Sequence, residues 1–76
     1  MDWNAVVASN VRRLRVARKL TQEQLALEAG LDLTYIGGIE RGRRNPTVKV
    51  LGQIAAVLGT DPLALLQPIA ASRDDD

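Results

Sequence analysis

Residues 20–42 of the chain read LTQEQLALEAGLDLTYIGGIERG, and the first half of this stretch carries the signals of a short helix. Thr21 is followed three residues later by Gln24, the spacing of a capping box, in which each side chain accepts a hydrogen bond from the other residue's backbone N–H group. Gly30 is placed to end the helix, because glycine readily adopts the left-handed conformation found at helix C-termini. These signals predict a helix over about residues 22–29.

The second half of the stretch predicts another short helix. Asp32 is a natural N-cap and Gly42 is placed to end the helix, which gives a segment over about residues 33–41. Gly37 and Gly38 lie inside it, and each costs about 1 kcal/mol of helix propensity relative to alanine. Packing rather than intrinsic propensity must therefore stabilise this helix.

Longer helices are predicted on both sides of this stretch. Asp2 is a plausible N-cap for a helix over about residues 3–18, and Thr47 caps another that ends at Gly59. The apolar residues of the first helix recur at the spacing of one helical face and are Trp3, Val7, Val11 and Leu14. Those expected to point inward from the other helix are Val48, Leu51, Ala55 and Leu58.

The last predicted helix is short. It begins at Thr60 or Asp61, has Pro62 in the favoured first turn and presents three leucines. The sequence contains five predicted helices and no long run of alternating apolar and polar residues, the pattern of a strand. It therefore predicts an all-α fold. We expect one domain over residues 1–69 and a flexible acidic tail over residues 70–76.

The composition argues against several classes of protein. The 76 residues are enough for one domain, and the chain has no cysteine and no histidine. This excludes disulfides, thiolate or imidazole metal ligands and the commonest general base, so we expect neither enzymatic activity nor a cofactor. The apolar stretches fall far short of the roughly 20 residues that span a membrane. The chain also begins without the apolar segment of a signal peptide, and we expect a cytoplasmic protein without membrane contact.

The net charge of +1 conceals an uneven distribution. Three of the nine acidic residues are Asp74, Asp75 and Asp76, and without them ten basic residues stand against six acidic ones, a net charge of +4. Five of the basic residues lie within residues 12–19 and three within residues 41–44. Such clusters suit a polyanionic partner, although a solvated helix face would carry the same charges.

The two short helices, joined by a turn of about three residues, match the helix-turn-helix unit, which places its second helix in the major groove of DNA. A small helical bundle that binds some other partner can contain the same pair. Spacing alone therefore leaves both interpretations open, while spacing and charge together favour DNA.

Several short motifs of the chain occur together in one family. They are Leu14-Arg15, Leu20-Thr21-Gln22-Glu23-Gln24-Leu25-Ala26, Gly30, Ile36, Ile39-Glu40-Arg41-Gly42 and Pro46. This combination resembles the lambda-repressor-like, xenobiotic-response-element (XRE) family of helix-turn-helix proteins, over about residues 7–66. Within the family, Leu33-Thr34-Tyr35-Ile36, Gly38-Ile39-Glu40-Arg41-Gly42 and Arg44-Asn45-Pro46-Thr47 look most similar to the controller proteins of bacterial restriction–modification operons. The resemblance implies a five-helix lambda-repressor-like fold that binds double-stranded DNA.

The resemblance also implies roles for residues near the helix N-termini. Gln22 would bind a DNA phosphate, which the positive end of the helix dipole also favours, unless it is a plain exposed side chain. Leu33, Thr34 and Gly38 would occupy the groove-facing side of the second helix, where Thr34 is the best candidate to contact a base. Leu33 departs from the polar residue of most relatives, and it would contact a thymine methyl group or cover the joint between the helices.

Further roles are implied around the end of the second helix. Tyr35 would pack against the sugar–phosphate backbone, or else be a half-buried aromatic residue with a solvated hydroxyl group. Arg43 would contact a phosphate, and Arg44 would reach a guanine, for which its two parallel donors are suited, unless it is merely solvated. Gly37 and Gly38 would let the helix backbone approach DNA closely.

Two charged residues are assigned to the architecture instead. The resemblance implies that Arg15 and Glu40 form an internal salt bridge that joins the first and third helices. Removing one partner of such a buried pair typically costs about 3–5 kcal/mol.

The last two predicted helices carry more apolar residues than are needed for the helix faces that point into the core. The surplus predicts a two-fold homodimer on a palindromic operator, with the two recognition helices about 34 Å apart. The residues expected at this interface are Val50, Ile54, Val57, Leu63, Leu65 and Leu66.

The predicted function is therefore a sequence-specific transcriptional regulator of the controller type. The alternative is the DNA-binding antitoxin of a toxin–antitoxin pair, which would need a protein partner. Activation of transcription would require a contact with RNA polymerase, for which Glu23 and Glu28 are candidates.

Overall fold

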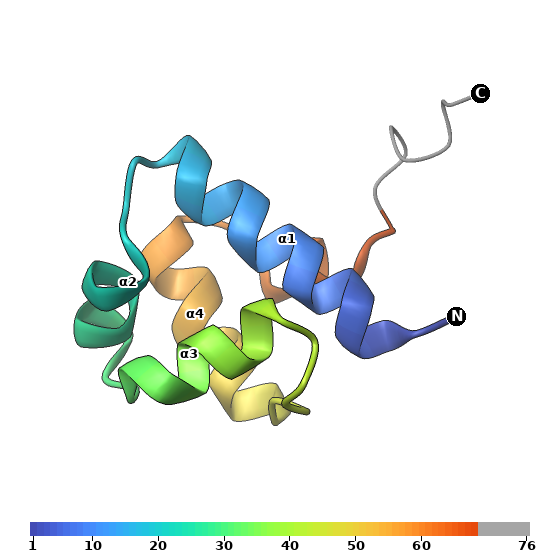
Figure 1. Cartoon of the computed structure of the whole chain (residues 1–76). Helices are drawn as coiled ribbons and strands as arrows, with labels where there is room; N and C mark the ends of the chain where they lie inside the picture. The colour runs from blue at the N-terminus through green and yellow to red at the C-terminus, as the bar shows by residue number, and fades with distance from the viewer. Residues whose placement is uncertain (69–76) are drawn as a thin grey trace.

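A computed structural model describes residues 1–68 and contains four α-helices and one 3₁₀ helix (Figure 1). They are α1 (Trp3–Ala17), α2 (Gln22–Ala29), α3 (Leu33–Glu40), α4 (Val48–Leu58) and η1 (Pro62–Leu66). The described residues form no strand, so the all-α prediction is confirmed. The fifth predicted helix is present as a 3₁₀ segment rather than an α-helix. The predicted end of the domain at residue 69 and the tail over residues 70–76 lie outside the described residues.

Side-chain caps begin each of these helices at the predicted positions. Thr21 and Gln24 form the capping box, with the Gln24 N–H group donating to Thr21 Oγ1 at 3.0 Å and the Thr21 N–H group donating to Gln24 Oε1 at 2.8 Å. Gly30 and Gly59 end α2 and α4 with φ angles of +72° and +68°. The N-caps of the other segments are Asp2, Asp32, Thr47 and Asp61. Because these signals are local, they fix the helix bounds to within about one residue.

The end of α3 is closed by a Schellman motif around Gly42. Gly42 has a φ angle of +73°, its N–H group donates to the Ile39 carbonyl at 3.0 Å, and the Arg43 N–H group donates to the Gly38 carbonyl at 2.9 Å. This geometry favours glycine, because other L-residues are strained at such a φ angle. The motif turns the chain back so that the next residues run beside α3.

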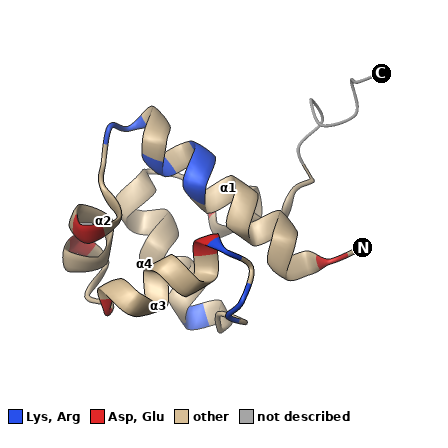
Figure 2. Ribbon diagram, viewed as in Figure 1, with Lys and Arg blue, Asp and Glu red and all other residues tan. Residues whose placement is uncertain are grey.

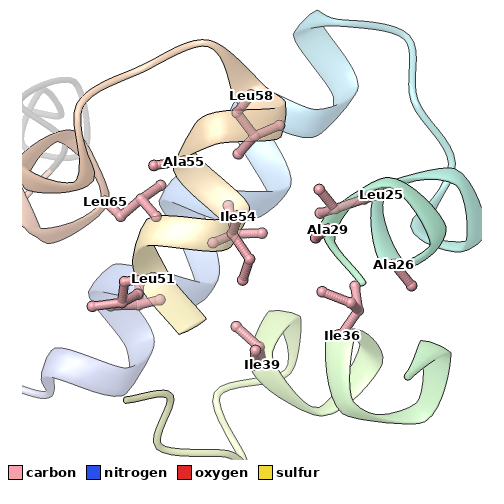
Figure 3. Close-up of a cluster of buried hydrophobic side chains, with 12 residues drawn as sticks. Leu25, Ala26, Ala29, Ile36, Ile39, Leu51, Ile54, Ala55, Leu58 and Leu65 are labelled. Carbon is pink, nitrogen blue, oxygen red and sulfur yellow. The ribbon is translucent and has the colours of Figure 1, made fainter. Parts of the chain in front are cut away.

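The helices pack around one core. α1 contacts α3 and η1, α2 contacts α3 and α4, and α4 contacts η1. In Figure 1, α1 lies across the domain with α2 and α3 beneath it. The side chains that fill the centre come from all five segments, and ten of them are labelled in Figure 3. The core residues are Val7, Val11, Leu25, Ala26, Ala29, Ile36, Ile39, Leu51, Ile54, Ala55, Leu58 and Leu65.

Packing stabilises α3 despite its two glycines. Ile36 and Ile39 are both fully buried, and burying an isoleucine side chain contributes about 1.5–3 kcal/mol. Two such side chains offset the roughly 1 kcal/mol of helix propensity lost at each of Gly37 and Gly38. The burial of Ile36 and Ile39 is consistent with the expectation that packing stabilises this helix.

Three apolar residues differ from their predicted environments. Val48 was expected to point inward but is 84% exposed, because it is the first residue of α4 and precedes the part that packs. Ile54 and Leu65 were expected at a dimer interface, and this is wrong, since both side chains are 0% exposed within one copy of the chain. Ile54 lies on the same face of α4 as Leu51 and Leu58, and η1 packs on that helix.

Asn10 is a buried polar residue that the sequence analysis did not single out. Its Nδ2 group donates to the carbonyl groups of Leu65 at 3.0 Å and Gln67 at 2.8 Å, and its Oδ1 atom accepts a hydrogen bond from Arg13 Nη2 at 3.1 Å. Carbonyl groups at the end of a helix lack partners within the helix. Asn10 supplies these partners and thereby fixes η1 and the following residues to α1.

Candidate nucleic-acid interface

The first turn of α3 presents polar and apolar side chains to the surface. Asp32 caps the helix by accepting a hydrogen bond from the Thr34 N–H group at 2.9 Å. Thr34 is exposed and Leu33 is 43% exposed, while Ile36 one turn later points into the core. The N-terminal part of this helix therefore offers a hydroxyl group and an apolar side chain outside the fold.

Exposed arginines follow α3. Arg43 and Arg44 come directly after the Schellman turn, and both are exposed. The Arg44 guanidinium lies over the ring of Tyr35, with Cζ 5.4 Å from the ring centroid. This distance is within the range of a cation–π interaction. Figure 2 shows these cations on the loop after α3 and a separate group of basic residues near the end of α1.

Gly37 and Gly38 are buried, which corrects the prediction that they leave the helix backbone open to DNA. A Cβ atom at Gly37 would lie 3.2 Å from Arg41 Nη1, and one at Gly38 would lie 2.6 Å from Arg44 Cγ. The two arginine side chains thus cover the α3 backbone at the two glycines.

The ion pair expected between Arg15 and Glu40 is present and has two hydrogen bonds. Arg15 Nε donates to Glu40 Oε2 at 2.6 Å, and Arg15 Nη2 donates to Glu40 Oε1 at 3.0 Å. Arg15 Nη1 also donates to the Leu20 carbonyl at 2.7 Å. The pair therefore joins α1, the loop before α2 and the last residue of α3.

Gln22 contributes a third hydrogen bond to the same carboxylate. Its Nε2 group donates to Glu40 Oε1 at 3.0 Å. One of the two Nε2 donors is therefore used within the fold, and the backbone N–H group of Gln22 lies in the first turn of α2, where such groups have no partner within the helix. Through this bond, the start of α2 is fixed relative to the end of α3.

Part of the basic cluster of α1 serves the fold. Arg13 donates to Asn10, Arg15 pairs with Glu40, and Arg18 Nη1 donates to the Leu58 carbonyl at 3.1 Å. A cation at the C-terminus of α4 is also favoured by the helix dipole. The sequence analysis foresaw the pair of Arg15 with Glu40 but not the bonds of Arg13 and Arg18. Arg12 and Lys19 remain exposed cations of this cluster.

A further side chain that the sequence analysis missed supports the helix-turn-helix unit. Gln53 Nε2, on α4, donates to the Ala29 carbonyl at the end of α2 at 3.0 Å.

Among residues 1–68, no three acidic side chains lie close enough together to hold a metal ion. No helix in the same part of the chain has the length and apolar character needed to cross a membrane. The arrangement is thus a braced helix pair with an exposed first turn on α3 and cations beside it.

These helices correspond to a known family. Residues 11–65 match the family model HTH_3, described as helix-turn-helix. The chain belongs to the HTH_3 family. This membership confirms the resemblance and the lambda-repressor-like, helix-turn-helix fold predicted from the sequence.

Proteins with solved structures or curated names are similar to this chain over most of its length. The control protein C.SmaI of Serratia marcescens is 46% identical over 66 residues, which are 87% of this chain and 79% of that protein. The hypothetical transcription factor NHTF from Neisseria has a TM-score of 0.87 and 40% identity, covering 95% of this chain and 80% of that one. The restriction-modification controller protein C.AhdI from Aeromonas hydrophila has a TM-score of 0.79 and 39% identity, and the match covers 82% of this chain and 94% of that one.

Proposed function

We propose that the protein is a sequence-specific transcriptional regulator that binds a palindromic DNA operator as a homodimer, in the manner of a restriction–modification controller protein. It would act in the cytoplasm through DNA binding and without catalysis. The observation that carries the proposal is the exposed first turn of α3 with two arginines beside it, in a chain similar to control proteins.

The contacts proposed with DNA follow from the chemistry of these side chains. Thr34 can bond a base edge and pack its methyl group on thymine, and Leu33 can make the same apolar contact. Arg44 has the paired donors that match guanine, while Arg43 and the Gln22 N–H group would bind phosphates. Tyr35 would contact the DNA backbone from beneath Arg44.

The dimer is supported by apolar side chains that remain exposed at η1. Leu63 is 65% exposed and Leu66 is 37% exposed, and Val50 and Val57 of α4 are only partly buried. Asn10 fixes this segment to α1. A second copy could therefore dock against a rigid surface, and the proposed interface consists of these four residues without Ile54 and Leu65.

Fluorescence anisotropy with DNA from the promoter of the protein's own gene tests the DNA contacts. Arg44→Ala and Thr34→Ala should each reduce the preference for operator over unrelated DNA by about 5- to 150-fold, the range for a lost base contact. Arg43→Ala is the matched control, because loss of a phosphate contact should weaken binding to all sequences and lower the salt slope by about one. Weak binding that is equal for all DNA would contradict the proposed function.

Sedimentation at tens of micromolar tests the dimer. The wild type should sediment as a dimer, and Leu63→Glu should sediment as a folded monomer because a charge would be buried at the interface. Leu27→Glu is the control, since Leu27 is more exposed than Leu63 but lies on α2, and it should remain dimeric. A wild-type monomer at this concentration would overturn the dimer.

A further inference from the structure

Gly38 is a glycine that its backbone conformation does not require. The glycines with positive φ angles among the described residues are Gly30, Gly42 and Gly59. Gly38 lies inside α3, where alanine would be the better helix former. The reason for glycine at this position must therefore be space rather than backbone conformation.

The space at Gly38 is occupied by Arg44. A Cβ atom built on Gly38 would lie 2.6 Å from Arg44 Cγ, 3.6 Å from Cδ and 3.5 Å from Nε. The first of these distances is shorter than the non-bonded contacts that Cβ atoms make in folded proteins. The aliphatic part of Arg44 thus lies directly on the α3 backbone, and any side chain at residue 38 would displace it.

The guanidinium group of Arg44 lies on the same face of α3. Tyr35 precedes Gly38 by three residues, so the two positions are neighbours on the helix surface. The guanidinium lies over the Tyr35 ring while the aliphatic part lies on Gly38. The Schellman turn at Gly42 fixes the point from which the Arg44 side chain starts.

We propose that Gly38 is a positioning residue that, together with the Tyr35 ring, holds Arg44 in one extended conformation beside the exposed turn of α3. This inference rests on the proposed function, because it assigns the direction in which Arg44 presents its donors to a base. An exposed arginine samples many rotamers, and ordering it upon binding weakens the complex. With the side chain held in advance, most of that loss is avoided.

The decisive comparison is between Gly38→Ala and Gly37→Ala. Both changes add one methyl group to α3 and improve helix propensity equally. At Gly37 the new Cβ atom meets the flexible end of Arg41, 3.2 Å away, and Gln22 Oε1 at an ordinary contact distance of 3.8 Å, whereas at Gly38 it meets Arg44 close to the main chain. We expect the operator Kd to rise about tenfold for Gly38→Ala and less than twofold for Gly37→Ala. Both variants should remain folded, since exposed Arg44 can move away.

A double-mutant cycle separates positioning from other effects of the methyl group. In an Arg44→Ala background, Gly38→Ala should leave the operator Kd unchanged, because no side chain remains to be displaced. An equal loss of affinity in both backgrounds would overturn the proposal, as would wild-type affinity of Gly38→Ala. If Gly38→Ala alone failed to fold and the double variant folded, the cause would be this contact, in support of the proposal.

A measurement without DNA distinguishes this inference from the proposed function. In the free protein, the Tyr35 ring should shift the NMR signal of the Arg44 guanidinium Nε–H group, and Gly38→Ala should abolish that shift while Gly37→Ala keeps it. Unshifted Arg44 signals in the wild type would refute the positioning. Shifted signals in a protein that binds all DNA equally would refute the proposed function and leave the positioning standing.

Discussion

Replacing Glu40 by glutamine tests the bracing of the helix-turn-helix unit. The Glu40 carboxylate accepts hydrogen bonds from Arg15 Nε, Arg15 Nη2 and Gln22 Nε2, and its side chain is 2% exposed. Glutamine has nearly the same shape, but an amide NH₂ group replaces one oxygen and would face these donors. At least one donor loses its acceptor, and the charge of Arg15, whose side chain is 12% exposed, loses its partner.

The size of the effect follows from the burial of the pair. Breaking a buried ion pair by removing one partner costs about 3–5 kcal/mol. A domain of this length has a total free energy of unfolding of about 4–11 kcal/mol. Because 1 kcal/mol corresponds to about 4–8 °C in a domain of this size, Glu40→Gln should lower the Tm by at least about 12 °C.

Thermal and urea unfolding followed by circular dichroism measure this loss. Glu28→Gln is the matched control, since Glu28 is exposed on α2 and its replacement should change the free energy of unfolding by less than about 0.5 kcal/mol. A loss below about 1 kcal/mol for Glu40→Gln would refute the reasoning, because that value is typical of a solvated surface pair.

Other substitutions have effects that the structure also determines. Gly52→Ala should raise the free energy of unfolding by about 0.5–1 kcal/mol, because a Cβ atom there meets nothing within 4 Å, and an unchanged or lower urea midpoint would contradict this. Gly42→Ala should lower the unfolding free energy by about 1 kcal/mol or more, since its φ angle is +73°, and a thermal melt equal to wild type would disprove the strain. Asn10→Ala should lower it by about 2 kcal/mol and speed hydrogen exchange in η1, because the carbonyl groups of Leu65 and Gln67 lose their donor; unaltered exchange would show that η1 is fixed by packing alone.

Much of the fold was predictable because its boundaries depend on short-range chemistry. Thr21 with Gln24, Asp32 and Thr47 act on N–H groups two or three residues away, so a local pattern contains the whole interaction. Gly30 and Gly59 likewise end helices through their own φ angles. The pairing of Arg15 with Glu40, 25 residues apart, came from the family resemblance and not from a local pattern.

The parts that could not be predicted depend on side chains that act far along the chain. Asn10 reaches carbonyl groups 55 and 57 residues away, and Arg18 reaches one 40 residues away. Helical periodicity carries no information about such partners. Counting surplus apolar residues also failed at Leu65, because η1 folds back onto α1 and α4 and buries that side chain. The glycine at residue 38 is understood only once the path of the Arg44 side chain is known.

The hydrogen bonds of Asn10 have a mechanical consequence. Asn10 lies on α1, which packs against α3 as well as η1, so the exposed leucines of η1 and the α3 helix are both held against one helix. In the proposed dimer, the two α3 helices would therefore keep one separation and one relative angle. Inserting one base pair between the operator half-sites moves one of them by about 3.4 Å and rotates it by about 34–36°. The proposed dimer would not follow that change, and the length of the spacer would become part of what the protein recognises.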